Sequence, residues 1–160
     1  MFDYEKVFID YDGVLVNSDE VLKNYMKKNN LTWDNVFDNV NWSLLYSEAR
    51  EINDSFNVMR LLQRKKSNIF VLTKIHSLVE AKVKIKLLRE NKIVVPVFVV
   101  PPHVKKSEIC LPTETSLLID DSQKNIDDWE DNGGIGFLFD GSENHLNGKK
   151  KVKSLHFLLK

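Results

Sequence analysis

Residues 7–16 of the chain read VFIDYDGVLV, an apolar run that leads into Asp10, Asp12 and Gly13. A buried charge without a partner costs several kcal/mol, so a buried strand rarely ends in two carboxylates without a reason. The carboxyl end of a strand is also where open α/β sheets bind their ligands. This stretch therefore predicts a ligand site at the end of the first strand.

A second acidic pair ends another apolar run, because residues 117–122 read LLIDDS. Four carboxylates on two strand ends would repel one another unless a cation lay between them. Carboxylate oxygens are the ligands that Mg²⁺ prefers, and Mg²⁺ sites of this kind serve phosphoryl transfer. We therefore expect a Mg²⁺ site formed by Asp10, Asp12, Asp120 and Asp121.

Composition sets the broad class of the protein. A chain of 160 residues is long enough for one domain and a modest insertion. Its 23 Lys and Arg balance its 23 Asp and Glu, which argues against a broadly basic surface for nucleic acid, although a local basic patch stays open. The single cysteine, Cys110, excludes an internal disulfide and a Cys-based zinc site. Because the chain shows neither a signal-peptide pattern nor an apolar run of about 20 residues, we expect a cytoplasmic protein without a membrane partner.

Five short apolar runs alternate with helix-like stretches, which predicts right-handed βαβ units. Most of the runs lack polar alternation, so we expect both faces of the sheet to be covered by helices. The predicted fold is a three-layer α/β sandwich with a mostly parallel five-stranded sheet. The expected strands are Val7–Asp10, Ile69–Leu72, Val94–Val100, Ser116–Ile119 and Gly136–Phe139, and the expected helices are Ser55–Lys65, Ser77–Asn91 and Ser122–Asn132. Apolar residues at Val152, Leu155 and Leu159 predict a further C-terminal helix.

The segment 17–54 is long, polar and helix-prone, and it does not fit the alternation. We interpret it as a small helical cap inserted after strand one, with residues 1–16 and 55–160 forming the core domain. Its aromatic residues either form the core of the cap or provide a platform for a nucleobase, and in so small a cap the first arrangement is the more common. These residues are Trp33, Phe37, Trp42 and Tyr46.

The residues that end the strands support hydrolysis of a phosphate ester. Asp10 is the expected nucleophile, since a carboxylate attacks phosphorus to give an aspartyl-phosphate. Asp12 lies two positions on, so it points in the same direction as Asp10 if the strand continues, and it is the expected acid and base. The Thr73 hydroxyl is placed to donate to a phosphate oxygen. Lys105 and Lys106 compete for one charge-stabilising role, and Lys106 is preferred because it starts a helix-like stretch.

These residues resemble the four motifs of the haloacid dehalogenase superfamily of phosphohydrolases, over most of the chain up to about Gly141. The motif positions are 10–14, Thr73, Lys106 and 120–122. The resemblance implies a Rossmann-like sheet with Asp121 as a direct metal ligand and Asp120 behind it. It implies that Asp10 and the backbone carbonyl of Asp12 complete the protein ligands.

The resemblance also implies a reaction. An Asp at position 12 implies a phosphatase, and residues 125–139 are similar to the branch that contains the small 5′-deoxyribonucleotidases. The expected substrate is therefore a small phosphorylated molecule, with a nucleoside monophosphate as the first candidate. The alternatives are another small metabolite, a polynucleotide end, or a binding protein that has kept this scaffold without catalysis.

Overall fold

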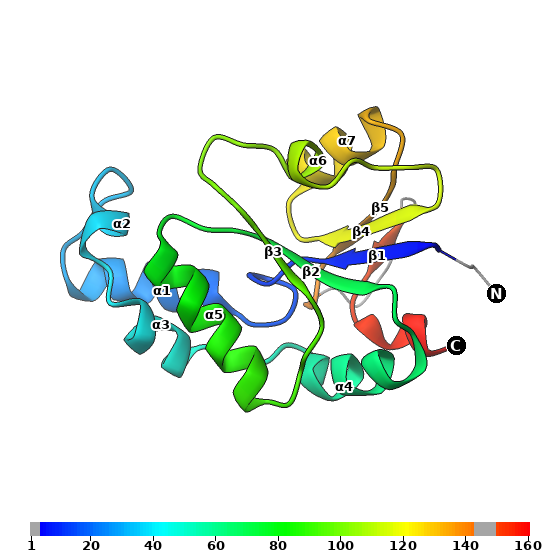
Figure 1. Ribbon diagram of the computed structural model, residues 1–160. Coiled ribbons are helices and arrows are strands. Elements are labelled where there is room, and N and C mark those ends of the chain that lie inside the picture. Colours follow the sequence, from blue (N-terminus) through cyan, green and yellow to red (C-terminus); the bar gives the residue numbers. More distant parts are fainter. Residues whose placement is uncertain (1–3, 143–149) are drawn as a thin grey trace.

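The chain folds around a parallel β-sheet that is covered by helices on both faces (Figure 1). The computed structural model describes residues 4–142 and 150–160. The strand order is β3-β2-β1-β4-β5-β6, and every neighbouring pair is parallel. The predicted α/β class with a parallel sheet is confirmed, but the sheet has six strands instead of five. The strands are β1 (Lys6–Ile9), β2 (Ile69–Lys74), β3 (Val97–Val100), β4 (Ser116–Asp120), β5 (Ile135–Phe139) and β6 (Lys151–Val152).

Two details of the predicted elements are wrong. Strand β3 begins at Val97 instead of Val94, because Pro96 has no N–H to give to a neighbouring strand. The expected C-terminal helix is shorter, since Val152 lies in β6 and only the 3-10 helix η1 (Leu155–Leu159) follows. A strand of two residues is too short to leave a pattern in the sequence.

The register of β1 places the two acidic pairs side by side. Ile9 is fully buried and pairs with Val71 of β2 on one side and with Ile119 of β4 on the other. The backbone N–H of Asp10 donates to the carbonyl of Ile119 over 2.9 Å. Asp10 and Asp120 are therefore next to each other at the carboxyl edge of the sheet.

Helices form one layer on each side of the sheet (Figure 1). Phe8 of β1 packs with Trp129 on one face, whereas Ile9 belongs to the apolar cluster of Met59 and Leu62 on the other. Burial on both faces explains why the strands read as continuous apolar runs. The first face is covered by α6 (Lys106–Ile109) and α7 (Gln123–Asp131), and the second by α4 (Ser55–Lys65), α5 (Leu78–Glu90) and η1.

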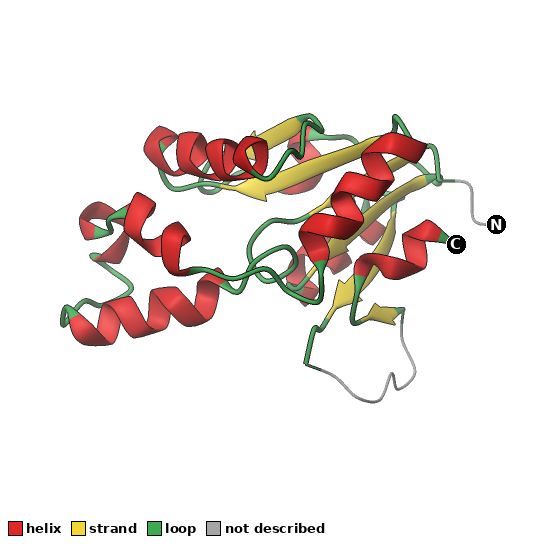
Figure 2. Ribbon diagram, turned by 90° about the horizontal axis from the view of Figure 1, so that it is seen from below, coloured by secondary structure: helices red, strands yellow, loops and turns green. Residues whose placement is uncertain are grey.

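Three short helices occupy the segment 17–54 and lie to one side of the sheet, where the strands end (Figure 2). They are α1 (Ser18–Lys28), α2 (Val36–Asn39) and α3 (Trp42–Glu48). Helix α3 packs along α5, and Leu22 and Leu45 belong to the same apolar cluster as Ile9. The cap is thus continuous with the core of the sheet domain.

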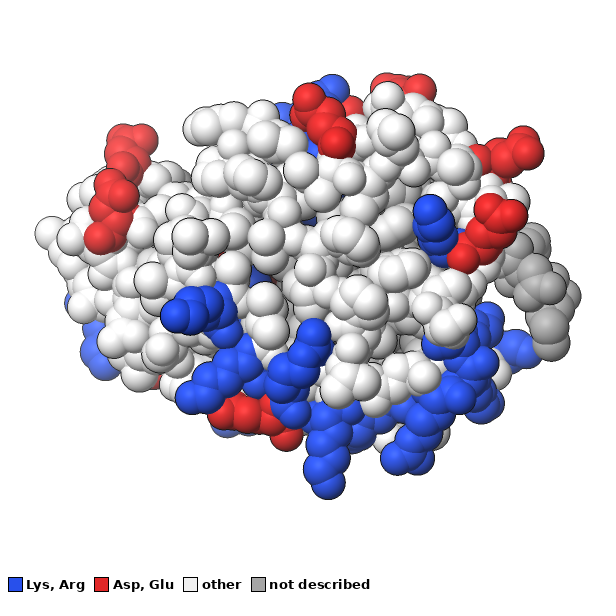
Figure 3. All heavy atoms as spheres, in the orientation of Figure 1, with Lys and Arg blue, Asp and Glu red and all other residues white. Residues whose placement is uncertain are grey.

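Charged side chains are segregated on the surface although the formal net charge is zero. Figure 3 shows Lys and Arg gathered along the lower edge of the molecule, where α5 and α4 lie, and acidic side chains mostly elsewhere. Arg64, Lys65, Lys82 and Lys86 are exposed on these two helices. In the described part of the chain, no helix has both the length and the apolar character needed to cross a bilayer.

Removing the Trp129 side chain tests how much the packing of α7 against the sheet stabilises the fold. Trp129 is 1% exposed, packs edge-on against Phe8 at 5.3 Å and donates its indole N–H to the carbonyl of Ser116. We expect Trp129→Ala to lower the free energy of unfolding by about 3–5 kcal/mol, because it leaves a large cavity. Urea denaturation measures this. The matched control is Trp33→Ala, since Trp33 is 56% exposed and its loss should cost less than about 1 kcal/mol. Equal losses of unfolding free energy in both variants would contradict the burial of Trp129 between α7 and the sheet.

Candidate active site

A buried lysine joins the two acidic pairs. Asp10 follows β1, Asp120 ends β4, and Lys106 is the first residue of α6. The Lys106 Nζ lies 2.7 Å from Asp10 Oδ1 and 2.6 Å from Asp120 Oδ2. Burial alone would lower the pKa of Lys106, but the charges of Asp10 and Asp120 outweigh it and raise that pKa above its usual value. Lys106 therefore stays charged between the two carboxylates.

The neighbouring Lys105 does not enter the site. Its exposed side chain reaches Asp128 on α7 instead, with Nζ 2.7 Å from Asp128 Oδ1. Of the two lysines that the sequence left in competition, the fold brings Lys106 to Asp10 and leaves Lys105 at the surface.

Three carboxylates converge beside Lys106. Ligand atoms of Asp10, Asp120 and Asp121 all lie within 4.8 Å of one another. Burial raises the pKa of Asp10 well above its usual value, Lys106 opposes this shift, and the charge of Asp120 adds to it. Such a cluster of oxygen donors is suited to a hard divalent cation.

The two members of the second acidic pair have different surroundings. Asp120 is fully buried, and both of its oxygens are engaged: Oδ2 by Lys106 and Oδ1 by the backbone N–H of Ser122. The Asn125 side-chain amide also donates to both Asp120 oxygens, at 3.2 and 3.1 Å. Asp121 is exposed, so the fold leaves it accessible to a ligand.

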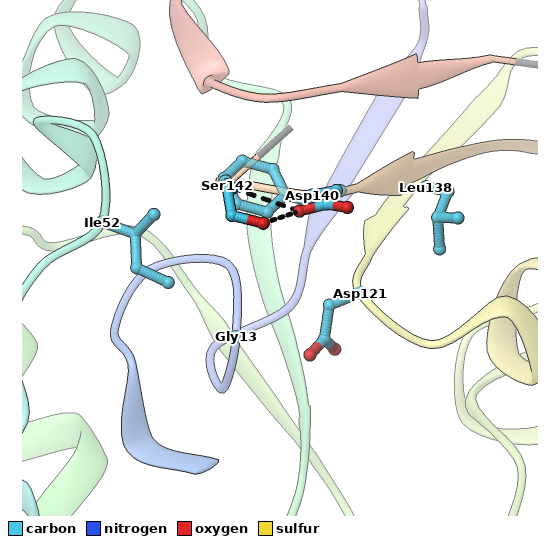
Figure 4. A pocket seen from close by; sticks show the side chains of 8 residues that line it. Gly13, Ile52, Asp121, Leu138, Asp140 and Ser142 are labelled. Carbon is cyan, nitrogen blue, oxygen red and sulfur yellow. Dashed lines mark hydrogen bonds between the residues drawn. The ribbon is translucent and has the colours of Figure 1, made fainter. Parts of the chain in front are cut away.

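Gly13 allows the loop after β1 to approach Asp121. Its φ of +77° lies in the left-handed region, and a Cβ at this position would lie 1.9 Å from Asp121 Oδ2. Figure 4 shows Asp121 facing this loop at the edge of a cavity of about 460 Å³. The cavity is lined by Gly13, Ile52, Asp121, Leu138, Phe139, Asp140, Gly141 and Ser142. The exposed carboxylate therefore faces open space.

The direction of Asp12 is not set by the strand, because the condition that the strand continues through it is not met. Strand β1 ends at Ile9, and the chain then turns, with the N–H groups of Leu15 and Val16 donating to the carbonyl of Tyr11. The cap and α5 hold the carboxylate instead. Its Oδ1 accepts hydrogen bonds from Ser18 Oγ at 2.6 Å and Tyr46 OH at 2.7 Å, and its Oδ2 from Lys84 Nζ at 2.6 Å.

These contacts determine the charge state of Asp12. Burial acts to raise the pKa of Asp12, but the Lys84 charge and the hydrogen bonds from Lys84, Ser18 and Tyr46 outweigh it and hold that pKa below its usual value. The carboxylate form therefore dominates at neutral pH.

Thr73 lies inside β2, fully buried, at the same end of the sheet. Its hydroxyl accepts a hydrogen bond from Lys84 Nζ at 3.1 Å and donates to the carbonyl of Lys74 over 3.3 Å. Lys84 thus contacts both Thr73 and Asp12, although sequence reasoning assigned it no role.

Three aromatic rings of the cap, those of Phe37, Trp42 and Tyr46, stack in nearly parallel planes together with His76, whereas the Trp33 ring is tilted. Phe37 stacks on His76 with centroids 3.5 Å apart, and Trp42 follows Phe37 at 6.3 Å. Trp42 and Tyr46 are buried, whereas Trp33 is exposed. Trp42 and Tyr46 therefore belong to the cap core. A cavity of about 130 Å³ lies beside these rings, lined by Asp12, Ser18, Asp19, Leu22, Trp33, Phe37, Trp42, Leu45, Tyr46, His76 and Glu80.

Solved structures match the fold of this chain, whereas no family model and no curated protein matches the sequence. A haloacid dehalogenase-superfamily hydrolase from Ehrlichia chaffeensis gives a TM-score of 0.63 at 8% identity, over 99% of this chain and 95% of that chain. A hydrolase of the same family from Deinococcus radiodurans, with bound phosphate and sodium, gives 0.61 at 14% identity, over 99% and 94%. The D,D-heptose 1,7-bisphosphate phosphatase of Burkholderia thailandensis gives 0.59 at 12% identity, over 98% and 99%. The fold is that of the haloacid dehalogenase hydrolases.

At these identities the likeness concerns the haloacid dehalogenase fold alone and does not show which reaction the site residues support. The similarity to the 5′-deoxyribonucleotidase branch stays a prediction. Within this fold, five of the predicted site residues gather around two buried lysines: Asp10 and Asp120 at Lys106, with Asp121 beside them, and Asp12 and Thr73 at Lys84.

A signal for Lys84 was present in the sequence of α5. The helix carries apolar residues at helical spacing, Leu78, Ala81, Ile85 and Leu88, but Leu78 is 75% exposed and Ile85 is only partly buried. The buried face of the helix carries Glu80, Ala81, Lys84 and Leu88 instead. A Glu and a Lys four residues apart, on the face that also carries Ala81 and Leu88, indicate a buried ion pair.

The metal-free stability should depend on pH through Asp121. Although Asp121 reaches the surface, the protein around its carboxylate excludes part of the water, and this desolvation together with the charge of Asp120 raises the pKa of Asp121 from 3.8 to about 7. Between these values the folded state binds a proton that the unfolded chain does not, so this group makes stability fall as pH rises. In EDTA, we expect Asp121→Asn to melt higher than the wild type at pH 8, with the difference shrinking toward pH 4. Thermal melts across this range measure the effect.

The matched control for this measurement is Asp127→Asn, because Asp127 is exposed on α7 and lies outside the cluster of Asp10, Asp120 and Asp121. It should keep the pH dependence of the wild type. An unchanged pH dependence in Asp121→Asn would contradict the shifted pKa.

Proposed function

We propose that the protein is a Mg²⁺-dependent phosphomonoester hydrolase that works through an aspartyl-phosphate on Asp10. The observation that carries this proposal is the cluster of Asp10, Asp120 and Asp121 within 4.8 Å at the carboxyl edge of the sheet, with the buried Lys106 between two of them. Three carboxylates against one ammonium leave two negative charges, which a divalent cation would cancel. The donor set is all oxygen, so it fits Mg²⁺.

Each residue has a role in this proposal. Asp10 Oδ attacks phosphorus while the bond to the leaving oxygen breaks, and water later cleaves the aspartyl-phosphate. Lys106 stabilises the negative charge on Asp10 and the phosphate. Mg²⁺, when bound, neutralises the carboxylates and the phosphate together. Asp10, Asp121 and the Asp12 carbonyl would hold it, with Asp120 behind them, because Lys106 and Ser122 occupy the Asp120 oxygens.

Asp12 and Thr73 complete the proposed reaction. In its protonated form Asp12 delivers a proton to the leaving alkoxide, and the carboxylate that results then takes a proton from the attacking water. The low pKa that Lys84 imposes on Asp12 favours the carboxylate form, which the second of these roles requires. The Thr73 hydroxyl donates to a phosphate oxygen.

The substrate is proposed to be a small phosphorylated molecule, with a nucleoside monophosphate as the first candidate. The cavity beside Asp12 is lined largely by aromatic and aliphatic side chains, and the exposed Trp33 borders it. This lining suits a flat leaving group. Another small phosphate ester, a polynucleotide end and a purely binding role are the alternatives.

Replacing the nucleophile tests the enzymatic role. We expect Asp10→Asn to reduce turnover of p-nitrophenyl phosphate by at least about a thousandfold, because an amide is a poor nucleophile and a poor Mg²⁺ ligand. Wild-type turnover should require Mg²⁺ and stop in EDTA. Asp127→Asn, an exposed Asp-to-Asn change on α7, is the control and should keep full activity. A wild type that is inactive with Mg²⁺ would favour the binding role instead.

Two tryptophan variants test whether the substrate is a nucleotide. If Trp33 stacks on the base, Trp33→Ala should raise KM for a nucleoside monophosphate roughly 5- to 150-fold, from about 1–3 kcal/mol of stacking, and spare p-nitrophenyl phosphate. Trp42→Ala should impair both substrates and lower the melting temperature, because Trp42 is 7% exposed within the cap core. Steady-state kinetics on both substrates, with melting curves, measure this. Parallel losses in Trp33→Ala would exclude base stacking.

A further inference from the structure

A second buried cation lies in the site, and the proposed reaction uses it only to favour the carboxylate form of Asp12. Lys84 of α5 is fully buried. Its Nζ lies 2.6 Å from Asp12 Oδ2, 2.8 Å from Glu80 Oε1, 2.8 Å from the Lys74 carbonyl and 3.1 Å from Thr73 Oγ1. An apolar residue in such a place is often as stabilising as a buried ion pair, so folding alone does not explain the lysine.

Lys84 determines which way the Thr73 hydroxyl donates. A hydroxyl has one proton to donate and two lone pairs that accept, and Lys84 occupies one lone pair. The proton is left with the carbonyl of Lys74 at 3.3 Å, a longer contact than the 2.7–2.8 Å that is usual for hydroxyl donors. A phosphate oxygen would replace this weak partner readily.

Lys84 also restrains the Asp12 carboxylate. It holds Oδ2, while Ser18 and Tyr46 from the cap hold Oδ1, so the carboxylate is anchored from both ends. The ammonium is itself confined, because it lies 5.5 Å from the centre of the Tyr11 ring and 5.6 Å from that of Tyr46. A carboxylate held in this way cannot rotate freely.

Glu80 is the second buried carboxylate that pairs with Lys84. Glu80 is 2% exposed, and its Oε1 pairs with Lys84 while its Oε2 accepts the backbone N–H of His76 at 2.6 Å. Removing Lys84 alone would leave Glu80 and Asp12 as neighbouring buried acids. Removing Lys84 and the Glu80 charge together would relieve this repulsion, which allows stability to be separated from activity.

We propose that Lys84 is a positioning residue that orients the Asp12 carboxylate toward the leaving group and the Thr73 hydroxyl toward the phosphate. This inference rests on the proposed phosphatase activity. Lys84 touches neither the phosphate nor the leaving group in this role and acts through Asp12 and Thr73.

The test compares two substrates that depend to different extents on proton donation by Asp12 to the leaving group. Phenyl phosphate releases a phenol with a pKa near that of tyrosine, about 10, whereas p-nitrophenol is a much better leaving group. Loss of the Lys84 charge makes Asp12 easier to protonate, so a weaker acid step in Lys84→Met would come from lost orientation and not from a lost proton. We expect Lys84→Met to lower kcat on phenyl phosphate by roughly a hundredfold or more, as general acid catalysis contributes about that much, and to affect p-nitrophenyl phosphate less. Adding Lys84→Met to Asp12→Asn should cost little more, since both changes remove one function.

The double variant Lys84→Met/Glu80→Gln provides the control for folding. We expect it to regain the wild-type melting temperature while keeping the low kcat on phenyl phosphate. Lys86→Met is the matched surface control, because Lys86 lies on the same helix, is exposed, and pairs only loosely with Glu90 at 3.7 Å. It should behave as the wild type.

The outcomes separate the two proposals. A wild type that hydrolyses neither substrate with Mg²⁺ overturns the phosphatase activity and this inference with it. An active wild type in which Lys84→Met affects both substrates equally overturns this inference alone. Recovery of activity in the double variant also overturns this inference alone. Failure of both Lys84 variants to fold does the same, because either result assigns Lys84 a structural role only.

Discussion

Electrostatic repulsion at the carboxyl edge of the sheet is the constraint on which this site depends. The parallel register of β1 and β4 places Asp10 beside Asp120, and the next residue, Asp121, adds a third carboxylate. Such a cluster is tolerated only where opposite charge compensates it. Lys106 supplies part of that compensation from α6, and it is held there because the loop from β3 returns over the same edge. The remaining negative charge is what the proposed Mg²⁺ would compensate.

A second centre of charge lies where the cap meets the sheet domain. Asp12 receives hydrogen bonds from Ser18 and Tyr46 of the cap and an ion pair from Lys84 of the sheet domain. The cap and the sheet domain also share one apolar cluster, so they pack as one body around this carboxylate. The position of the cap and the orientation of Asp12 are therefore physically linked. Any movement of α1 or α3 away from the sheet would take hydrogen-bond donors away from Asp12.

Much of the fold could be predicted from the sequence, because strands buried on both faces leave continuous apolar runs. Five strands and the three helices α4, α5 and α7 were visible in this way, and so were the acids at the strand ends. Strand β6 was missed because two residues carry no periodicity. The partners of Asp12 could not be predicted, because β1 ends at Ile9 and only the folded chain shows which side chains hold the carboxylate. Lys84 was missed because the helical stripe was drawn through apolar residues alone, whereas the buried face of α5 contains an ion pair.

The sequence by itself determined the α/β class, the parallel sheet and the two acidic pairs, since each follows from local runs of apolar and charged residues. The tertiary structure alone decided between Lys105 and Lys106, because these neighbours differ only in which one points into the sheet edge. It alone brought Lys84 to Asp12, 72 positions away, and Tyr46 to the same carboxylate from the cap. Contacts of this kind depend on how helices pack across the sheet. Local patterns carry no information about that packing, so these partners could be seen only in the fold.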